Sequence, residues 1–353
     1  MISRTMGMAW AAPGAALAAA LALSACSNGG GNASRDQIRA VGSSTVYPFT
    51  TAVTEQFARR QTQFKAPIVE STGTGAGMKL FCAGVGARFP DIENASRAIK
   101  KSEMDDCTKN GVRDIVEIQI GIDGIVMAES LRGEAMRLTP ADVYRALAAD
   151  PYGKPQTAKL WRDVNPALPA IPIVVYGPPP TSGTRDAFAE LILQKGCDAN
   201  PAMDALKKAD AKRHTAICTK VREDGAYVES GENDNLIVQK LSANPDAVGV
   251  FGYSFLEENA DRVRGIPMNG IVPTYETIAD YSYPGSRPLY IYVKGQHLNV
   301  VPGLRELVAE YANDWGRGGY LARRGLIVAP ADVSERNRQI ALNFTPLDPA
   351  TVK

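Results

Sequence analysis

One local pattern occurs three times in this chain and constrains its fold more than any other feature. Each time, a short strand-like run leads into a loop of small and hydroxyl-bearing residues, and residues at helical spacing follow. The three loops read VGSST (41–45), STGTGAG (71–77) and GPPPTSGT (177–184). Because strands that alternate with helices are typical of α/β folds, we predict an α/β architecture with parallel sheets.

The same alternation extends along the rest of the chain. The predicted strands cover residues 38–41, 67–69, 115–126 and 171–176. The predicted helices cover residues 48–60, 78–82, 141–149, 185–194, 235–241 and 303–311.

Two extended segments indicate crossings between two domains. They are IQIGIDGIVM (118–127) and RPLYIYV (287–293), and each is bordered by a turn-like break. A chain of 353 residues is long enough for two domains. We therefore predict that domain I is discontinuous (37–122 and 293–353), and that domain II (123–292) is inserted into it through a double hinge.

The N-terminal segment is predicted to be a targeting signal and not a part of the folded domain. Residues 1–25 hold one charge, Arg4, and then an alanine- and leucine-rich stretch that is too short for a membrane span of about 20 residues. This layout is that of a secretory signal peptide. Its end, LSAC (23–26), resembles a bacterial lipobox in which Cys26 is lipidated; the alternative is a plain signal peptide cut near Ala25. The following residues, 26–36, are predicted to be a flexible tether.

The sequence contains five cysteines, and a lipid on Cys26 leaves four. An even number in an exported chain indicates disulfides. Four cysteines allow three pairings. We predict the two local ones, Cys82–Cys107 and Cys197–Cys218, because the members of each pair are only about 20–25 residues apart.

A metal site is the rival interpretation of these cysteines. No CxxC motif and no Cys/His spacing supports it. The only two histidines, His214 and His297, are isolated in the sequence. We predict surface or structural roles for both, and neither a metal nor a cofactor.

The three loops indicate an anion site. Small residues before a helix leave its first N–H groups uncovered, and the positive end of the helix dipole lies at the same place. Serine and threonine hydroxyls add further donors, although these residues are also ordinary helix N-caps. Repetition of the pattern makes anion binding an equal alternative to capping alone.

Two arginines support this interpretation. Arg185 begins the helix after the third loop, and Arg97 ends the stretch DIENASR (91–97). The planar guanidinium group suits tetrahedral oxyanions. The alternative role for both arginines is ion pairing at the surface.

Nucleotide and nucleic-acid binding are both disfavoured. Residues 73–80 fail the P-loop pattern, because Met78 holds the second glycine position and Leu80 follows the lysine; the same methionine breaks G-x-G-x-x-G. The chain carries 39 basic and 38 acidic side chains. It therefore lacks the broad basic surface that nucleic-acid binding needs.

Six stretches together resemble the PstS family, the substrate-binding proteins of the bacterial phosphate ABC importer. They are GSSTVYP (42–48), STGTGAG (71–77), DIENASR (91–97), YGPPPTSGTRDAF (176–188), VGVFGY (248–253) and YPGSRPLYIYVK (283–294). They span nearly all of the chain after the signal segment, in the family's order. The resemblance implies the two-domain periplasmic-binding-protein fold of type II, in which two α/β domains close on phosphate in the cleft between them.

The resemblance also implies which positions bind phosphate. Thr45 with the Val46 amide matches the first family contact, and Ser182, Gly183 and Thr184 match the family's S-G-T contact. Where many relatives have a serine, Ala76 offers only its backbone N–H. The full set of predicted phosphate-binding residues is Ser44, Thr45, Val46, Gly75, Ala76, Ser96, Arg97, Asp123, Ser182, Gly183, Thr184 and Arg185.

Two departures from the family's pattern affect this set. The family's arginine before the S-G-T contact corresponds to Pro178, so we predict that Arg97 or Arg185 takes over its role. Many relatives have aspartate after Ser96, where this chain has arginine. The carboxylate that accepts a proton from phosphate is therefore predicted to be Asp123, whose alternative role is a hinge turn. Such a carboxylate would distinguish phosphate from sulfate, which carries no proton.

These observations predict a monomeric, lipid-anchored phosphate receptor in the periplasm that delivers phosphate to an ABC permease of the inner membrane. A receptor of the same fold for another oxyanion, such as sulfate, molybdate or tungstate, is the first alternative. A periplasmic phosphatase is the second. It would need a nucleophile with a base or a metal cluster, which two isolated histidines do not supply.

Overall fold

The computed structural model describes residues 35–231, 234–316 and 318–352. The predicted signal segment, the predicted lipidation site at Cys26 and most of the predicted tether lie outside these residues. Among the residues that are described, no helix is both long enough and apolar enough to span a membrane.

Nine strands in the described part of the chain form one hydrogen-bonded sheet. Their order is β2-β1-β3-β9-β4-β7-β5-β6, and β8 pairs with β4 beside this path. The strands are β1 (Arg39–Gly42), β2 (Ile68–Ser71), β3 (Ile92–Ala95), β4 (Ile115–Ser130), β5 (Val175–Gly177), β6 (Tyr227–Glu229), β7 (Val248–Gly252), β8 (Val263–Gly265) and β9 (Ser286–Lys294).

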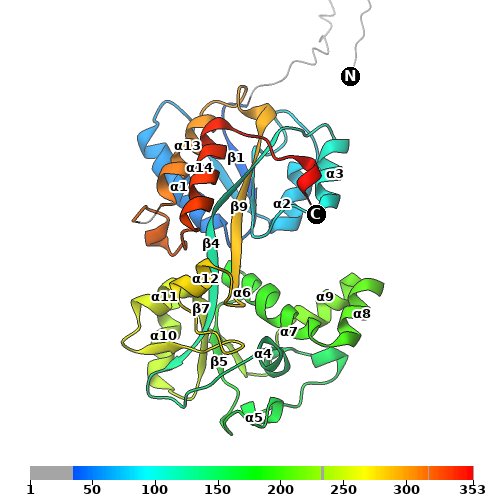
Figure 1. Cartoon of the computed structure of the whole chain (residues 1–353), viewed down its shortest axis with the longest axis vertical. Helices are drawn as coiled ribbons and strands as arrows, with labels where there is room; N and C mark the ends of the chain where they lie inside the picture. Colours follow the sequence, from blue (N-terminus) through cyan, green and yellow to red (C-terminus); the bar gives the residue numbers. More distant parts are fainter. Residues whose placement is uncertain (1–34, 232–233, 317, 353) are drawn as a thin grey trace, which may run out of the picture. The chain divides into compact units, whose positions relative to one another are not determined.

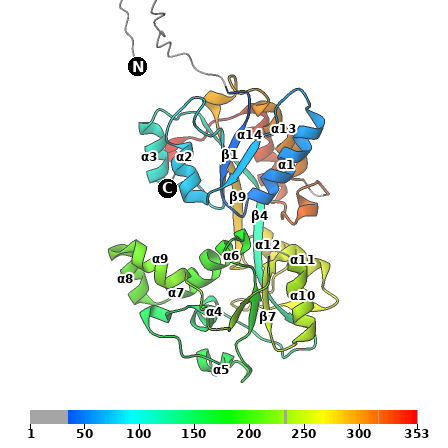
Figure 2. The same cartoon turned by 180° about the vertical axis from the view of Figure 1, so that it is seen from behind.

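Helices pack on both faces of the sheet (Figures 1 and 2). They are α1 (Tyr47–Arg60), α2 (Thr74–Phe81), α3 (Lys101–Lys109), α4 (Pro140–Leu147), α5 (Trp161–Val164), α6 (Gly183–Phe188), α7 (Gln194–Asp198), α8 (Pro201–Ala209), α9 (Ala211–Thr219), α10 (Asp234–Ala243), α11 (Tyr253–Glu258), α12 (Tyr275–Ala279), α13 (Leu304–Asp314) and α14 (Ala331–Asn343). A π-helix, η2 (Ala189–Leu193), joins α6 to α7. Short 3-10 turns are η1 (Pro151–Gly153), η3 (Gly295–His297), η4 (Ala322–Arg324) and η5 (Pro349–Thr351).

Two long antiparallel strands, β4 and β9, connect the two halves of the sheet. They pair from Ile115 opposite Lys294 to Gly124 opposite Ser286, with a β-bulge between Gln119 and Gly121. Beyond this stretch, β4 pairs with β7 and β8. Figure 1 shows β4 and β9 running lengthwise between the two groups of elements. The two predicted crossing segments lie in these strands.

The prediction of parallel pairing is correct at the ends of the sheet and wrong in its middle. β1 pairs in parallel with β2 and β3, and β5 pairs in parallel with β6 and β7. However, β9 is antiparallel to β3 and β4, and β4 is antiparallel to β7 and β8. The reason is that the chain returns to the first half through β9, against the direction of β4, and not through another strand–helix–strand unit.

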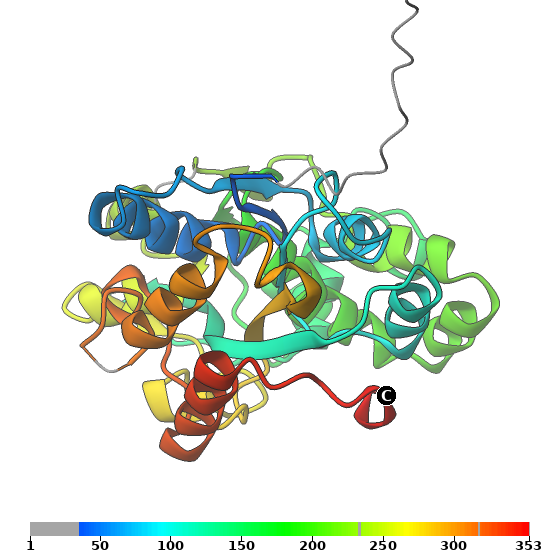
Figure 3. The same ribbon diagram turned by 90° about the horizontal axis from the view of Figure 1, so that it is seen from above.

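The two halves have separate hydrophobic cores. The core around β5, β7 and the second part of β4 includes Trp161. In the other half, Phe57 and Tyr311 pack between the sheet and helices α1 and α13, whereas Phe81 and Met104 pack between the sheet and helices α2 and α3. In Figure 3, α1 (blue) and α13 (orange) accordingly lie on the side away from α2 and α3 (cyan). The sheet of this half is therefore covered on both faces.

Both predicted disulfides are present. Cys82–Cys107 joins the end of α2 to α3, and Cys197–Cys218 joins α7 to α9. Each closes a loop of moderate length, and such bonds typically contribute about 2–4 kcal/mol to stability.

Candidate functional site

Two of the three predicted loops leave the sheet at one edge. In the parallel register, Gly42 of β1 lies opposite Ser71 of β2 and opposite Asn94 of β3, so the three strands end together. Loop 1 (43–46) leads from β1 into α1, and loop 2 (72–73) leads from β2 into α2. The carboxyl ends of parallel strands are the usual ligand-binding edge of α/β proteins. Loop 3 (178–182) leads from β5 into α6 in the other half.

Loop 1 contacts the first turn of α6. The Thr45 hydroxyl donates to the carbonyl oxygen of Gly183 at 3.0 Å, and the Ser44 hydroxyl donates to the Asp186 carboxylate at 2.8 Å. A Cβ atom on Gly183 would lie 2.4 Å from the Thr45 nitrogen. The two halves of the fold therefore meet through backbone at a position where only glycine fits.

A cavity of about 530 Å³ opens at this meeting point. Six of the predicted binding residues line it: Ser44, Thr45, Asp123, Ser182, Gly183 and Thr184. The other lining residues are Tyr47, Pro48, Phe49, Ser71, Thr181, Gly252, Ser254, Phe255, Arg324 and Gly325. Because hydroxyl groups are frequent in this lining, the cavity is rich in hydrogen-bond donors.

Some donors of the loops already have partners within the protein. The Ser182 hydroxyl accepts from the Thr184 N–H at 3.2 Å, as an N-cap of α6. In loop 1, the Ser43 hydroxyl accepts from the N–H groups of Thr45 and Val46 at 3.2 and 3.4 Å. The capping role that the sequence left open as an alternative is thus realised at α6, whereas α1 and α2 have no side-chain cap. An anion would compete with the contacts of the Ser182 and Ser43 hydroxyls.

Loop 2 contributes less to the cavity than the sequence predicted. Gly75 and Ala76 are exposed in the first turn of α2 and do not line the cavity. Ser96 follows β3 and is tied to the same turn, because its N–H donates to the Thr74 hydroxyl at 3.1 Å. Only Ser71, at the end of β2, reaches the cavity from this side.

Neither predicted arginine lines the cavity. Arg97 makes a bidentate ion pair with Glu103, at 2.8 and 2.9 Å, and this pair raises the pKa of the arginine. Arg185 donates to the carbonyl oxygen of Pro178 at 3.3 Å, and its guanidinium lies 4.1 Å from the centre of the Tyr227 ring. Both side chains are therefore engaged by neighbours in their own half of the fold.

Arg287 on β9 is the arginine beside the cavity, and the sequence analysis did not select it. Its side chain is 5% exposed. It donates to the Thr45 hydroxyl at 2.6 Å, pairs with Glu190 of the π-helix at 2.7 Å, and lies 3.4 Å from the Asp123 carboxylate. π-Helical segments frequently mark functional sites. A signal for Arg287 exists in the sequence, since it is a charge at the start of an otherwise apolar crossing segment.

Arg287 and Asp123 face one another across the two crossing strands. The register of β4 and β9 places them opposite each other. Burial raises the pKa of Asp123, and the positive charge of Arg287 opposes that shift. A second arginine that the sequence analysis did not select, Arg324, lines the cavity itself and donates to the Tyr320 hydroxyl at 2.6 Å. The cavity therefore has cationic groups at two positions.

A second carboxylic acid is buried beneath loop 1. Glu93 is fully buried, and neither of its carboxylate oxygens has a hydrogen-bond partner. Burial raises the pKa of Glu93 well above its usual range, and the nearby negative charge of Glu103 acts in the same direction. A Cβ atom on Gly77 would lie 2.3 Å from this carboxylate, so that glycine makes room for it. A neutral Glu93 adds no negative charge near the anion-binding edge.

This arrangement suits the holding of a small oxyanion. Hydroxyl groups line the cavity from both halves, a guanidinium bonds to one of them, and a carboxylate is present that can accept a proton. Neither histidine lines the cavity: His297 is buried against Asp91 at 2.6 Å, and His214 lies against Asp198. The cavity lining therefore lacks an imidazole that could activate a hydroxyl as a nucleophile.

Comparisons with known proteins identify relatives of this chain. A family profile described as PBP superfamily domain matches residues 27–315. Protein SphX of Synechococcus elongatus is 31% identical over 307 residues, which cover 85% of this chain and 80% of SphX. Phosphate-binding protein PstS of Staphylococcus saprophyticus is 30% identical over 337 residues, which cover 92% of each chain.

Solved structures show the same fold. A possible phosphate binding protein from Planctomyces limnophilus superposes with a TM-score of 0.69 at 28% identity, over 87% of this chain and 98% of that protein. An ABC-type phosphate transport receptor from Vibrio cholerae superposes with a TM-score of 0.58 at 20% identity, over 82% of this chain and 99% of the receptor. The described residues thus form a two-domain periplasmic-binding-protein fold of type II.

Proposed function

Because this chain belongs to the PBP superfamily and, within it, to the PstS family of phosphate-binding proteins, we propose that it captures inorganic phosphate outside the cytoplasm and delivers it to an ABC importer. The observation that carries this proposal is the cavity where loop 1 meets α6. An anion bound there would contact both halves of the fold at once. Its binding would therefore favour the closed arrangement of the two domains.

The phosphate oxygens without protons accept hydrogen bonds from both halves in this proposal. The hydroxyls of Thr45 and Thr184 and the guanidinium of Arg287 are the donors. Thr45 and Arg287 currently bond to each other, so phosphate would exchange one internal contact for contacts of its own. Because Arg287 is almost fully buried, each charge-assisted hydrogen bond it makes is stronger than one at the surface.

Asp123 is the acceptor of the phosphate proton in this proposal. It lines the cavity, and Arg287 holds it at 3.4 Å. Phosphate near neutral pH carries at least one proton, whereas sulfate carries none and would place an unpaired charge against the carboxylate. Asp123→Asn is therefore expected to lower the ratio of phosphate to sulfate affinity by about tenfold or more. An unchanged ratio would show that another group selects the ligand.

A receptor for another oxyanion is the second candidate. Arg97 stands where many relatives have an aspartate, and its guanidinium is occupied by Glu103. A site that lacks an effective proton acceptor would favour fully deprotonated ions such as sulfate, molybdate or tungstate. Titration with each ion separates this candidate from the first.

The domain motion is proposed to pass through the predicted boundaries at 122/123 and 292/293, where β4 and β9 cross between the halves. The receptor is proposed to act as a monomer in the periplasm, held at the membrane by a lipid on Cys26, and to catalyse no reaction. Mass spectrometry of the mature N-terminus tests the lipid. Turnover of a generic phosphate ester that is lost in Ser182→Ala would contradict the last part of the proposal.

Isothermal titration is the direct test of the function. The full chain is first stripped of bound anions by unfolding, dialysis and refolding. Phosphate is expected to bind one site per chain, and sulfate at the same concentration is expected to give no heat beyond dilution. Ion chromatography of the anion released from freshly purified protein supplies an independent identification. Sulfate binding without phosphate binding would overturn the proposal.

A further inference from the structure

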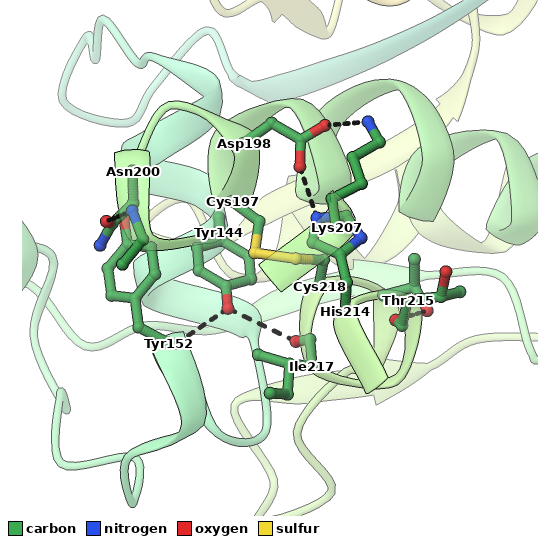
Figure 4. The surroundings of a disulfide bond; sticks show 12 residues. Tyr144, Tyr152, Cys197, Asp198, Asn200, Lys207, His214, Thr215, Ile217 and Cys218 are labelled. Atoms are coloured by element: carbon green, nitrogen blue, oxygen red, sulfur yellow. Dashed lines mark hydrogen bonds and ion pairs between the residues drawn. A yellow bond between two sulfur atoms is a disulfide. The ribbon is translucent and has the colours of Figure 1, made fainter. Parts of the chain in front are cut away.

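The disulfide Cys197–Cys218 lies beside a histidine and an aspartate (Figure 4). His214 and Cys218 stand one turn apart on α9, and Cys197 and Asp198 are the last two residues of α7. The two sulfur atoms and a ring nitrogen of His214 all lie within 4.8 Å of one another. The cluster is not visible as a Cys/His spacing in the sequence, because Cys197 comes from a different helix.

The cluster is buried, so the surface role considered for His214 is wrong. Its side chain is 1% exposed, and both cysteines are fully buried. The Nε2 atom of His214 lies 2.6 Å from the Oδ1 atom of Asp198. The other carboxylate oxygen of Asp198 accepts from the Lys207 ammonium at 2.7 Å. These contacts hold the imidazole in place beside the sulfur atoms.

These donors are the ones that zinc prefers. Zinc in proteins takes four ligands from cysteine sulfur, histidine nitrogen and carboxylate oxygen in a tetrahedron, with bonds of about 2.0–2.3 Å. Neighbouring donors around such an ion are about 3.3–3.8 Å apart. The two sulfur atoms and a ring nitrogen of His214 lie within 4.8 Å of one another, so small side-chain movements after the disulfide opens would bring these three donors to that spacing. Cysteine ligates zinc as the thiolate, so only the dithiol form of the cluster qualifies.

We propose that the Cys197, His214 and Cys218 cluster is a redox-dependent Zn²⁺ site, in which Asp198 orients the imidazole. A dithiol reductant transfers two electrons and two protons to the sulfur atoms of Cys197 and Cys218 and is itself oxidised to a disulfide. Zn²⁺ then displaces the two thiol protons, and His214 supplies a nitrogen ligand. A disulfide oxidant that accepts two electrons from the two thiolates, and is itself reduced to a dithiol with two protons from water, restores the disulfide and releases Zn²⁺.

The other disulfide is an internal control. Cys82 and Cys107 lie in an apolar cluster with Met78, Phe81 and Met104. The Cys82 sulfur lies 3.5 Å from the carbonyl oxygen of Glu103. Within the described ranges, no other group of three His, Cys, Asp or Glu ligands is placed closely enough for a metal. Reduction of Cys82–Cys107 therefore creates two thiols but no zinc site.

The test uses the full chain with Cys26→Ser, so that reduction produces only four thiols. The protein is reduced with dithiothreitol under nitrogen, desalted and titrated with Zn²⁺ in competition with a chromophoric chelator. The reduced chain is expected to bind one Zn²⁺, and the oxidised chain none. Co²⁺ in place of Zn²⁺ is expected to give the absorption bands of a tetrahedral thiolate site.

Matched variants identify the ligands. His214→Asn is expected to weaken Zn²⁺ binding by the reduced chain about 10-fold to 100-fold, whereas Cys82→Ser/Cys107→Ser is expected to leave it unchanged. Circular dichroism before and after reduction reports whether the fold persists. Equal Zn²⁺ affinity in His214→Asn and its parent would overturn the proposal. So would a reduced chain that binds no Zn²⁺, whether folded or unfolded.

Discussion

Arg97 lies just after the end of β3, and Arg287 lies at the start of β9. The two side chains have different exposure and different partners. The Arg97 side chain is 32% exposed, and its bidentate partner, Glu103, is only six residues away in the sequence. The Arg287 side chain is 5% exposed, and its three partners come from loop 1, β4 and the π-helix. Arg97 therefore stabilises a local turn, whereas Arg287 joins both halves of the fold beside the cavity. Both arginines lie in stretches that resemble the family, so position within such a stretch does not distinguish them.

Removal of Arg287 is expected to have the largest effect. Arg287→Ala leaves Asp123 buried without its cation and removes a donor from the anion, so phosphate affinity is expected to fall by about 100-fold or more. Arg287→Lys keeps the charge but not the planar fork, and an intermediate loss is expected. Isothermal titration measures both, with circular dichroism as the control for folding. Unchanged phosphate affinity in Arg287→Ala would show that Arg287 does not contribute to the binding site.

A methyl group at Gly183 is expected to have the next largest effect. The added Cβ would overlap the Thr45 nitrogen, so Gly183→Ala should push loop 1 away from α6. Phosphate affinity is expected to fall by about tenfold or more, while each half keeps its own core. Gly75→Ala is the matched control, because a Cβ there meets no atom within 4 Å. Equal effects of the two substitutions would mean that the contact between the halves does not matter for binding.

Glu93 belongs to the same segment as Arg97, and it is expected to affect stability and not binding. Burial raises its pKa in the folded chain. At a pH between the unfolded and the folded pKa of Glu93, the folded state holds a proton that the unfolded state has lost. The stability that the chain has at low pH is therefore lost as the pH rises from the unfolded pKa through the folded one. Glu93→Gln stays neutral, so its unfolding temperature relative to the parent should be higher at about pH 8 than at about pH 5. A difference that does not change with pH would indicate that Glu93 is not neutralised by burial.

Removal of Arg97 is expected to have the smallest effect on the ligand. Arg97→Ala breaks only the partly exposed pair with Glu103, so phosphate affinity should change by less than about threefold. Stability should fall by about 1 kcal/mol or less. Parallel titrations of Arg97→Ala and Arg287→Ala give the ratio of the two losses of phosphate affinity. A loss in Arg97→Ala as large as that in Arg287→Ala would place Arg97 in the binding site after all.

The sequence predicted the parts of the fold that depend on local pattern. α1 begins within one residue of the prediction, with Pro48 in its first turn, and both disulfides have the predicted pairing. β3 was missed because its four residues, IENA, include the polar Glu93 and Asn94. Their burial depends on the packing of α1 and α2, which a four-residue pattern does not reveal.

The loop residues of the candidate site could be predicted from the sequence, but its charged residue Arg287 could not. Ser44, Thr45 and Ser182 lie in loops 1 and 3, where the local sequence shows small and hydroxyl-bearing residues. All three line the cavity. Arg287 contacts Thr45 across 242 positions of sequence. That contact exists because β9 returns alongside β4, and no local spacing contains this information. The same is true of the contact between His214 and the disulfide, since the latter joins two helices.

The pairing of β3 with β9 constrains the order in which the proposed exported receptor folds. Ile92 lies opposite Val293, so the first half of the sheet cannot be completed until the chain near residue 293 is available. Contacts of such high sequence separation form slowly, because a long loop must be closed before they contribute. Both disulfides, by contrast, join residues 25 and 21 positions apart. They can form while the chain is still emerging, and the unpaired edge of β3 is then the surface that most needs protection from aggregation until β9 arrives.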